Sequence, residues 1–435
     1  MASGRYFADE IMLAADGAWH DIKITLPAVK DRGPLVLRSC RDTPCRAKVR
    51  MHSVQVSDPF DTQQTVDEFL AAGEAMLKEH SAKELRQGRA STALRNFLKQ
   101  IATACSMSLL EPADAAFSDA LNLLSDKQLI TFAKSQLLPA TATPFRDWCF
   151  DWAAGRPEPH WQLRTALWRA MRDRCPDVEL EMPWLEGTHV RMPLKSDLSF
   201  PLFTLGQFEP NICAALAPMI KPGETFIDVG ANEGLYTLLA AARVGKSGKV
   251  IAIEPSPREL NRLRANIARN SFKSRVAVID QALSNEAGWA EFAVANEAHS
   301  GQNAFLDIVA RNIAINEVRP TPLLTLDMIA ARLGSRIVDF VKIDVEGAEL
   351  EVIEGGLSVL EQQRPTWVVE VGRSDAPSTG AVERLFREAG YKIFVVDDHM
   401  GQTRLLCDAQ IETAENILAI PSERAAKVWP NKQGT

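Results

Sequence analysis

Phe226-Ile-Asp-Val-Gly-Ala-Asn-Glu-Gly234 is the stretch of this chain that decides its fold. An apolar run ends at the acidic residue Asp228 and is followed by two glycines, Gly230 and Gly234. We interpret the stretch as a buried strand, a sharp turn at Gly230 and a helix that Gly234 lets approach a ligand closely. A strand, a glycine turn and a helix in this order predict a ligand site at the edge of a parallel sheet.

The spacing of the two glycines bears on which ligand is bound. It is Gly-x-x-x-Gly, whereas dinucleotide-binding turns use Gly-x-Gly-x-x-Gly, in which the extra glycine lets the backbone approach a pyrophosphate. The carboxylate of Asp228 would repel a pyrophosphate but suits an amino group or a hydroxyl. S-adenosylmethionine carries an ammonium, a sulfonium and a ribose, and it has no phosphate. The pattern therefore favours S-adenosylmethionine, and an NAD-dependent oxidoreductase is the alternative.

A second acid stands at the end of the next apolar segment, Lys249-Val-Ile-Ala-Ile-Glu254. Glu254 follows Gly230 by 24 residues, which is typical of a carboxylate that accepts hydrogen bonds from ribose hydroxyls. Pro255-Ser-Pro-Arg258 then starts a helix. Either acid alone is an ordinary strand-end residue, but Asp228 and Glu254 at this spacing together favour a nucleoside site.

A third segment, Val338-Asp-Phe-Val-Lys-Ile-Asp-Val-Glu-Gly-Ala-Glu349, has a lysine inside an apolar strand. Lys342 there implies a buried partner, for which Asp344 and Glu370 are the candidates. Asp344 and Glu346 crowd carboxylates at the strand end, and such crowding creates general bases by raising pKa values. A helix start that is acidic because of the helix dipole explains Glu346 equally well.

Strands alternate with helices from about residue 181 onward. The candidate strands are Thr225–Val229, Val250–Glu254, Val276–Ile279, Phe340–Asp344, Trp367–Val371, Tyr391–Val396 and Asn416–Ile420. The candidate helices are Leu235–Val244, Arg258–Asn270, Ala348–Leu360 and Ala381–Ala389. This alternation predicts an α/β domain with a mostly parallel sheet that helices cover on both faces.

The residues before this domain show a different pattern of apolar residues. Residues 1–60 contain short alternating segments that predict a small β-rich unit, and residues 61–180 show apolar stripes at helical spacing. Tryptophans recur in the helical region, at Trp148, Trp152 and Trp168 among others. An aromatic groove for a sugar or partner would explain them, but a helical core is the interpretation we favour. The expected division is therefore 1–60, 61–180 and 181–435.

Composition excludes several classes of protein. The 435 residues carry a formal net charge of −7, which argues against a dedicated nucleic-acid binder. No run of roughly 18 apolar residues occurs, and the start of the sequence lacks a signal-peptide pattern, so we expect no transmembrane segment. The 7 cysteines are odd in number and scattered, which favours a reducing, cytoplasmic location over a disulfide framework.

Several motifs lie in order along residues 185–421. They are Asp228-Val-Gly-Ala-Asn-Glu-Gly234, Glu254-Pro-Ser-Pro257, His299-Ser-Gly-Gln-Asn303, Thr325-Leu-Asp327 and Val341-Lys-Ile-Asp-Val-Glu-Gly-Ala-Glu349. Together they resemble the FkbM family of S-adenosylmethionine-dependent methyltransferases. The sequence departs from the family at Glu233, where an apolar or small residue is usual. That position bears on how the methionine end of the cofactor sits.

The resemblance implies a Rossmann-like class I methyltransferase domain that uses S-adenosyl-L-methionine. It implies O-methylation of a sugar, glycan or polyketide hydroxyl. The cofactor-binding residues that we expect are Asp228, Gly230, Asn232, Gly234, Glu254, Pro255, Ser256, Gln281, Ala282 and Asp344. A methyltransferase fold that has lost its activity and serves as a binding module is the second alternative.

The methylated hydroxyl needs a base, and His299, Asp344 and Glu346 are the candidates. His299 has a near-neutral intrinsic pKa and lies in a glycine-containing loop, although a surface histidine explains it equally well. Lys342 is expected to pair with Asp344 or Glu370. A divalent metal held by Asp344 and Glu346 is a minority alternative, because no other ligand is evident, and we expect no metal.

The acceptor is expected to be a small molecule or a glycan, with lipid-linked intermediates included, and not a nucleic acid. Its identity depends on the shape of a pocket whose loops carry no readable code. The N-terminal residues 1–180 are expected either to select the acceptor or to drive self-association into a homo-oligomer.

Overall fold

The computed structural model describes residues 161–308, 313–371, 378–399, 402–407 and 416–428, with short stretches between 121 and 140. The β-rich unit predicted for residues 1–60 lies outside the described residues. So does most of the predicted helical region, including Trp148 and Trp152. Among the helices that the structure describes, none combines the length and the apolar character needed to cross a membrane.

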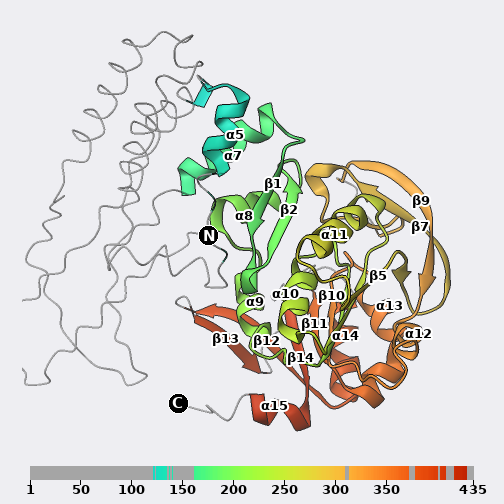
Figure 1. The fold of residues 1–435 in the computed structure, drawn as a ribbon. Helices are drawn as coiled ribbons and strands as arrows, with labels where there is room; N and C mark the ends of the chain where they lie inside the picture. The colour runs from blue at the N-terminus through green and yellow to red at the C-terminus, as the bar shows by residue number, and fades with distance from the viewer. Residues whose placement is uncertain are drawn as a thin grey trace, which may run out of the picture.

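An eight-stranded sheet forms the centre of the described residues (Figure 1). From edge to edge its strands are β13 (Gln402–Cys407), β12 (Tyr391–His399), β14 (Asn416–Pro421), β11 (Thr366–Glu370), β10 (Phe340–Ile343), β3 (Thr225–Val229), β4 (Lys249–Ile253) and β5 (Val276–Ile279). Strands β11, β10, β3, β4 and β5 pair in parallel, whereas β14 and β13 pair antiparallel with their neighbours. The predicted mostly parallel α/β sheet is confirmed.

Helices cover both faces of this sheet. Helices α10 (Leu235–Val244) and α11 (Pro257–Arg269) lie on one face, and α12 (Leu326–Ala331), α13 (Glu349–Glu354) and α14 (Ser378–Glu388) lie on the other. Because side chains alternate along a strand, Phe226 and Phe340 stack on the first face at 6.0 Å while Ile227 and Val341 pack on the second. All five residues of β3 are buried. Its run of apolar residues is therefore the signature of a strand covered on both sides.

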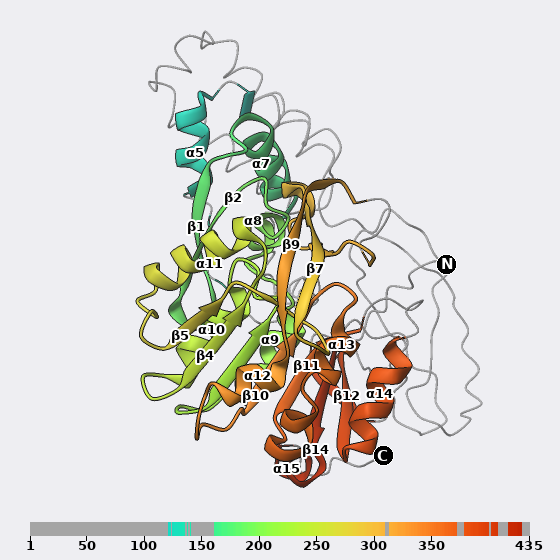
Figure 2. The same cartoon turned by 90° about the vertical axis from the view of Figure 1, so that its right-hand side faces the viewer.

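A second sheet lies between β5 and β10 in the sequence, and the strand candidates above did not include it. Its order is β6 (Ala282–Leu283), β9 (Ile315–Leu324), β7 (Gly288–Ala295) and β8 (Ala304–Phe305). Figure 2 shows β7 and β9 side by side as a long antiparallel ribbon. The ribbon is hard to see in the sequence because β9 contains Pro320 and Pro322 and much of it is exposed.

The segments before β3 share the apolar cluster of the first face. They are α5 (Asp126–Lys134), α7 (Trp161–Arg174), β1 (Glu179–Pro183), η2 (Leu185–Gly187), β2 (His189–Pro193), α8 (Ser199–Leu205) and α9 (Pro210–Leu216). Trp168 donates its Nε1–H to Ser199 Oγ at 3.0 Å and packs edge-on against Phe200. Trp184 donates to the carbonyl of Leu235 at 2.8 Å. Both tryptophans are buried, as expected of core residues rather than of an open groove.

The helix predicted over Ala348–Leu360 is wrong as a single element. The structure has α13, a turn at Gly355 and Gly356, and a separate helix η4 (Val359–Gln363). A Cβ at Gly355 would lie 2.1 Å from the carbonyl oxygen of Ser284, so the turn passes the backbone just after β6 at a distance that only glycine allows. The chain ends its described part with α15 (Ser422–Val428) after β14.

Candidate functional site

The turn after β3 and the end of β10 touch each other. Gly230 has φ +77°, and a Cβ placed on it would lie 1.8 Å from the carbonyl oxygen of Asp344. Glycine is therefore required both for the turn and for this contact. Gly234 has φ +102°, and its missing side chain leaves room for Leu263 of α11. Gly234 thus packs two helices together rather than opening α10 to a ligand.

A narrow pocket of about 60 Å³ lies where the parallel strands end. The predicted residues that line it are Gly230, Asn232, Glu254, Pro255, Ala282, Asp344 and Glu346. The predicted residues that do not line it are Asp228, Gly234, Ser256, Gln281, His299 and Lys342. Four of these six residues, namely Asp228, Ser256, Gln281 and His299, are adjacent in sequence to a residue that lines the pocket. Ser256 and Lys342 each bind the carboxyl group of a lining residue, as the following contacts show.

Glu254 is held at the end of β4 by two backbone donors. Its Oε2 accepts the N–H of Asn232 at 2.8 Å and its Oε1 accepts the N–H of Ser256 at 2.8 Å. Burial, with the nearby carboxylate of Glu259, raises the pKa of Glu254 to about 8. Ser256 thus fixes the orientation of Glu254 without reaching the pocket, and its hydroxyl donates to Glu259.

Asp228 lies beneath the pocket at the end of β3. Its Oδ2 accepts a hydrogen bond from the Thr237 hydroxyl at 2.5 Å, and its Oδ1 is buried without a hydrogen-bond partner among the described residues. Burial raises the pKa of Asp228, although the Lys342 ammonium opposes the shift. Asp228 stands opposite Lys342 in the register of β3 and β10.

Lys342 has the buried partner that its place in an apolar strand implied. Its Nζ lies 2.7 Å from Asp344 Oδ2 and 4.6 Å from the centre of the Tyr236 ring. Burial favours the neutral amine, but the carboxylates of Asp344, Asp228 and Glu209 outweigh it and raise the pKa of Lys342. Of the two partners predicted, the ion pair forms with Asp344.

Sequence reasoning missed Glu209. This residue precedes α9 and accepts hydrogen bonds from Tyr236 Oη at 2.6 Å and Asn416 Nδ2 at 3.1 Å. Burial raises the pKa of its carboxyl group, while the charge of Lys342 acts in the opposite direction. Nothing in the local sequence marks Glu209, because its partners come from α10 and β14.

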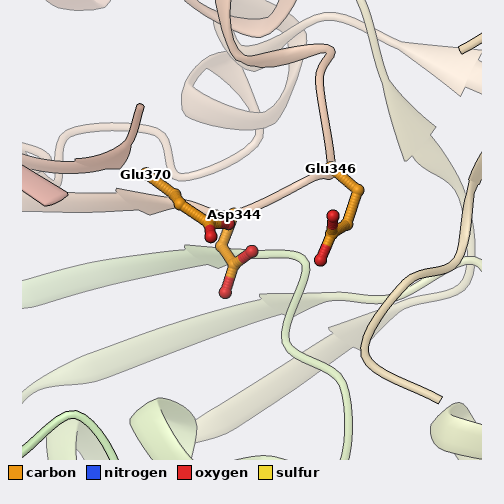
Figure 3. A group of neighbouring side chains, drawn as sticks. All are labelled: Asp344, Glu346 and Glu370. Atoms are coloured by element: carbon orange, nitrogen blue, oxygen red, sulfur yellow. The ribbon is translucent and has the colours of Figure 1, made fainter. Parts of the chain in front are cut away.

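Three carboxyl groups gather at the edge of the sheet, those of Asp344, Glu346 and Glu370 (Figure 3). One oxygen from each lies within 4.8 Å of the others. Burial and the neighbouring Asp344 raise the pKa of Glu370 to about 11. Burial alone would also raise the pKa of Asp344, but the Lys342 ammonium and a hydrogen bond with Glu370 lower it. Glu370 is therefore protonated at neutral pH beside an ionised Asp344.

This protonation pattern bears on whether the group would hold a metal. Divalent cations prefer ionised oxygen ligands, whereas Glu370 carries a proton and Asp344 already faces an ammonium. The ion pair with Lys342 already balances one of the three carboxyl groups, which disfavours a divalent cation there. Glu370 is the strand-end acid of β11, next to β10, so its place in the sheet was the signal that could have put it in the site.

The loop after β7 lies across the pocket. Ser300, Gly301 and Asn303 line it, and the side chain of Asp197 accepts hydrogen bonds from Ser300 Oγ at 2.6 Å and from Gly301 N at 2.8 Å. His299, in the short helix η3 (Glu297–His299), has its Nδ1 2.9 Å from Asn296 Oδ1 and does not line the pocket. Asp197 was missed because its role depends on a contact between distant segments.

Glu233, the departure from the family pattern, points away from the pocket. It is fully buried, and its Oε1 pairs with Arg262 Nη1 of α11 at 2.8 Å. Burial raises the pKa of Glu233 to about 7 against the opposing charge of Arg262. The unusual residue is therefore accommodated by an arginine on the adjacent helix.

Much of the rest of the pocket wall is apolar and comes from the second sheet. Leu283, Phe292 and Phe305 line it, and the two phenylalanine rings meet edge to face with centres 6.0 Å apart. The sequence carried no signal for these residues because β6, β7 and β8 were not predicted. Their burial against one another gives the pocket a rigid aromatic side.

The residues present fit S-adenosylmethionine better than a dinucleotide. Three carboxyl-bearing residues, Glu254, Asp344 and Glu346, line the pocket, and no lysine or arginine of the described chain does. Such a lining attracts a sulfonium or ammonium and repels a pyrophosphate. In addition, Asn232 Oδ1 is buried without a hydrogen-bond partner in the described part of the chain. This oxygen is therefore available to accept a hydrogen bond from a ligand.

Comparisons with known proteins agree with this geometry. Residues 228–393 match the sequence model of the methyltransferase FkbM domain. The AMB antimetabolite synthetase AmbE of Pseudomonas aeruginosa is 27% identical over 228 residues, which make up 44% of this chain and 11% of AmbE. The 31-O-demethyl-FK506 methyltransferase FkbM of Streptomyces tacrolimicus is 28% identical over 205 residues, 41% of this chain and 76% of that enzyme.

A crystal structure of methyltransferase FkbM from Methylobacillus flagellatus KT aligns with a TM-score of 0.31 at 16% identity. The alignment covers 45% of this chain and 43% of that one. Against the synthetase AmbE, the present chain spans about a tenth of the relative's length.

The fold and the site define a Rossmann-like methyltransferase domain with a mostly parallel sheet. Residues 228–393 belong to the FkbM family of methyltransferase domains. The cofactor of this domain is S-adenosyl-L-methionine, as the sequence predicted.

Proposed function

We propose that this chain is an O-methyltransferase that methylates a hydroxyl group of a sugar, a glycan or a related natural product. The observation that carries the proposal is the pocket at the strand ends, lined by carboxyl groups and by no basic side chain of the described residues. The relative from Streptomyces tacrolimicus is named a 31-O-demethyl-FK506 methyltransferase, which supports oxygen as the methylated atom.

The lining divides into two parts that match the two halves of the cofactor. Glu254 accepts hydrogen bonds from ribose hydroxyls, and the apolar wall of Leu283, Phe292 and Phe305 covers the adenine. The free oxygen of Asn232 accepts from the ammonium of the methionine end. Asp228 acts from below, because its carboxyl group fixes the start of α10 through Thr237.

S-adenosylmethionine supplies an activated methyl group when it is bound. The task of the chain is therefore to orient the acceptor hydroxyl, and good orientation lowers the barrier by on the order of 7–11 kcal/mol. Asp344 is ionised and lines the pocket, so it accepts the hydrogen bond of the hydroxyl and then its proton. Lys342 holds this carboxylate in place, and the proton of Glu370 satisfies it from the side.

Replacement of Asp344 tests this assignment. Asp344→Asn keeps the shape of the side chain but removes the base, so turnover at saturating S-adenosylmethionine should fall by ~10²–10⁴-fold. Glu346→Gln and His299→Ala are measured in the same assay, which follows labelled methyl transfer to isolated glycans and lipid-linked intermediates. Full turnover in Asp344→Asn would exclude Asp344, and the variant that loses activity would identify the base.

Two alternatives predict different observations. An inactive binding module would bind S-adenosylmethionine without forming S-adenosylhomocysteine during incubation with acceptors. An NAD-dependent oxidoreductase would change nicotinamide absorbance on addition of substrate, but Asp344 and Glu346 in a pocket without described cations disfavour a pyrophosphate there.

A further inference from the structure

A second cleft, of about 560 Å³, lies beside the loop that covers the cofactor pocket. Arg172 at the end of α7, Lys195 after β2 and Arg258 in the first turn of α11 line it. Asn296 and Glu297 line it from the loop after β7. We call this the basic cleft, after its three cationic side chains. Its volume lies in the range of small-molecule sites.

The basic cleft and the cofactor pocket share one wall. Residues 296–298 line the basic cleft, whereas Ser300, Gly301 and Asn303 of the same loop line the cofactor pocket. A molecule in the basic cleft is therefore separated from the cofactor by a single loop. The hydroxyl that is methylated must contact the cofactor, so the cleft suits a group of the acceptor that lies some distance from that hydroxyl.

Arg258 is fixed in position with one donor unused. Its Nη1 donates to the carbonyl of Ala295 at 2.8 Å and its Nε lies 2.6 Å from Glu259 Oε1. Its Nη2 is buried and has no hydrogen-bond partner among the described residues. A buried donor without a partner costs free energy, and a small movement of the Arg258 side chain toward the cleft would let an oxyanion there satisfy it.

The negative charges near the basic cleft are already balanced by neighbouring basic side chains. Glu297 is bonded through both oxygens to Arg262 Nη2 at 2.9 Å and lies 3.3 Å from Lys195. Glu259, which pairs with Arg258, is fully buried behind the arginine, and Asp177, which pairs with Lys195, is exposed to solvent. Arg172, Lys195 and Arg258 thus outnumber Glu297, the acid of the described residues that lines the cleft, and Glu297 is already paired with Arg262 and Lys195.

Arg172 completes the cationic lining. Its guanidinium lies 5.1 Å from the centre of the Trp168 ring and is exposed, and the ion pairs recorded for the described residues do not include it. A guanidinium over the face of an indole leaves its N–H donors available for other partners. Arginines from two elements and a lysine from a third converge on one open volume.

We propose that the basic cleft binds the phosphoryl or diphosphate group of a phosphorylated methyl acceptor. This inference rests on the proposed function and narrows its substrate class, since planar guanidinium groups and an ammonium are the donors that recognise phosphate oxygens. Sugar nucleotides and lipid-linked diphosphate glycans share this group. A neutral sugar or polyketide would leave the donor of Arg258 unsatisfied.

Inorganic pyrophosphate is the probe that tests the cleft, with the full chain in a calorimeter. Binding should weaken at least tenfold in Arg172→Gln and in Arg258→Gln. Arg258→Lys keeps the charge but loses the planar fork, so it should fall between Arg258→Gln and the wild type. Arg264→Gln is the matched control, because Arg264 lies on the exposed side of the same helix and pairs with Asp280 at 3.4 Å. It should bind pyrophosphate as the wild type does.

The affinity for S-adenosylmethionine, measured on the same proteins, separates the two proposals and reports that each variant is folded. If S-adenosylmethionine binds but pyrophosphate does not, or if all variants bind pyrophosphate equally, the inference is overturned and the proposed function stands. Competition between pyrophosphate and S-adenosylmethionine would place the anion in the cofactor pocket and also overturn the inference. If S-adenosylmethionine fails to bind, the proposed function fails, and the cleft loses its role in methyl transfer.

Two larger probes distinguish the sources of the phosphate. UDP-glucose carries the diphosphate of a sugar nucleotide, and geranyl diphosphate carries that of an isoprenoid lipid. If one of the two probes binds more tightly than pyrophosphate, and Arg172→Gln loses this binding, the inference is supported. The probe that binds then identifies the source of the phosphate. Both binding more weakly than pyrophosphate would contradict it.

Discussion

At the scale of single residues, the acids of the site differ because their surroundings differ. Glu254, Asp344 and Glu370 all end strands of one sheet, yet burial raises the pKa of Glu254 and Glu370 while Lys342 lowers that of Asp344. A lysine two positions before an aspartate on the same strand puts both side chains on one face. The sequence placed Lys342 and Asp344 together. It did not show which acid would hold a proton, because Glu370 belongs to β11, a different strand.

Binding of S-adenosylmethionine should depend on pH through Glu254. Its pKa is raised to about 8, so the free protein is mostly protonated there at lower pH. Ribose hydroxyls donate to the ionised form, and binding therefore releases a proton. We expect affinity to rise as pH increases toward 8, by at most about tenfold per unit, and to level off above it.

Calorimetric dissociation constants between pH 6 and 9 check this expectation. Glu254→Gln should bind more weakly and show little of the pH dependence that the wild type shows. A wild-type dissociation constant that stays constant over this range would contradict the assignment of the titrating group.

Stability should depend on pH through Glu370. Its pKa is about 11 in the folded chain, against an ordinary value of 4.5, so between these values the folded state holds a proton that the unfolded state lacks. The free energy of unfolding therefore falls as pH rises, by up to about 1.4 kcal/mol per unit from this group. Glu370→Gln mimics the protonated side chain and should escape this loss.

Thermal melting at pH 5 and pH 9 measures the effect. The gain in melting temperature of Glu370→Gln over the wild type should be larger at pH 9. Glu388→Gln changes an exposed residue of α14 and serves as the control. Equal gains at both pH values would show that Glu370 does not carry the proton.

At the scale of elements, the parts of the site on parallel strands were predictable and the parts on loops were not. Strands that run in parallel end at one edge, so Asp228, Glu254 and Asp344 could be placed together from their spacing alone. Asp197 and Ser300 meet only because two loops fold against each other. The second sheet was missed because its strands are short, exposed or interrupted by proline.

The loop after β7 should control access of the cofactor. The pocket of about 60 Å³ is far smaller than the roughly 300–1,000 Å³ of ligand sites, so it has to open for the cofactor to bind, and the loop that carries Ser300 and Gly301 is the part that we expect to move. Asp197 anchors both residues. We expect Asp197→Ala to speed both association and dissociation of S-adenosylmethionine severalfold.

Stopped-flow fluorescence gives both rate constants. Glu388→Ala removes an exposed carboxylate of α14 and is the control. Unchanged rates in Asp197→Ala would mean that the loop opens without releasing this anchor.

At the scale of the whole molecule, the described helices before β1 share the core of the methyltransferase domain. Leu129 of α5, Leu167 and Trp168 of α7, and Leu238 of α10 belong to one continuous apolar cluster. The sequence distinguished the helical texture from the α/β texture, but periodicity alone does not say whether two regions share a core. The division at residues 60 and 180 stays a prediction.

Removal of one hydrogen bond in this shared core should destabilise the protein as a unit. Trp168→Phe keeps most of the apolar surface but leaves the buried Ser199 hydroxyl without the indole donor. We expect a loss of about 1–3 kcal/mol in the free energy of unfolding. Urea unfolding followed by circular dichroism measures it.

Ile337→Val, at an exposed apolar residue of the same protein, is the control. If the main unfolding transition is unchanged and the loss of stability is confined to a separate transition at lower urea concentration, α7 unfolds independently.

The acid-rich lining of the cofactor pocket has a consequence for the end of each catalytic cycle. Transfer of the methyl group converts a positively charged sulfonium into a neutral thioether. The side chains of Asp344 and Glu346 then no longer face a cation, and once Asp344 has released the proton that it took from the acceptor, the two carboxylates repel each other. We expect the wild type to hold S-adenosylhomocysteine less tightly than S-adenosylmethionine. The charges that favour binding of S-adenosylmethionine would thus also favour release of S-adenosylhomocysteine.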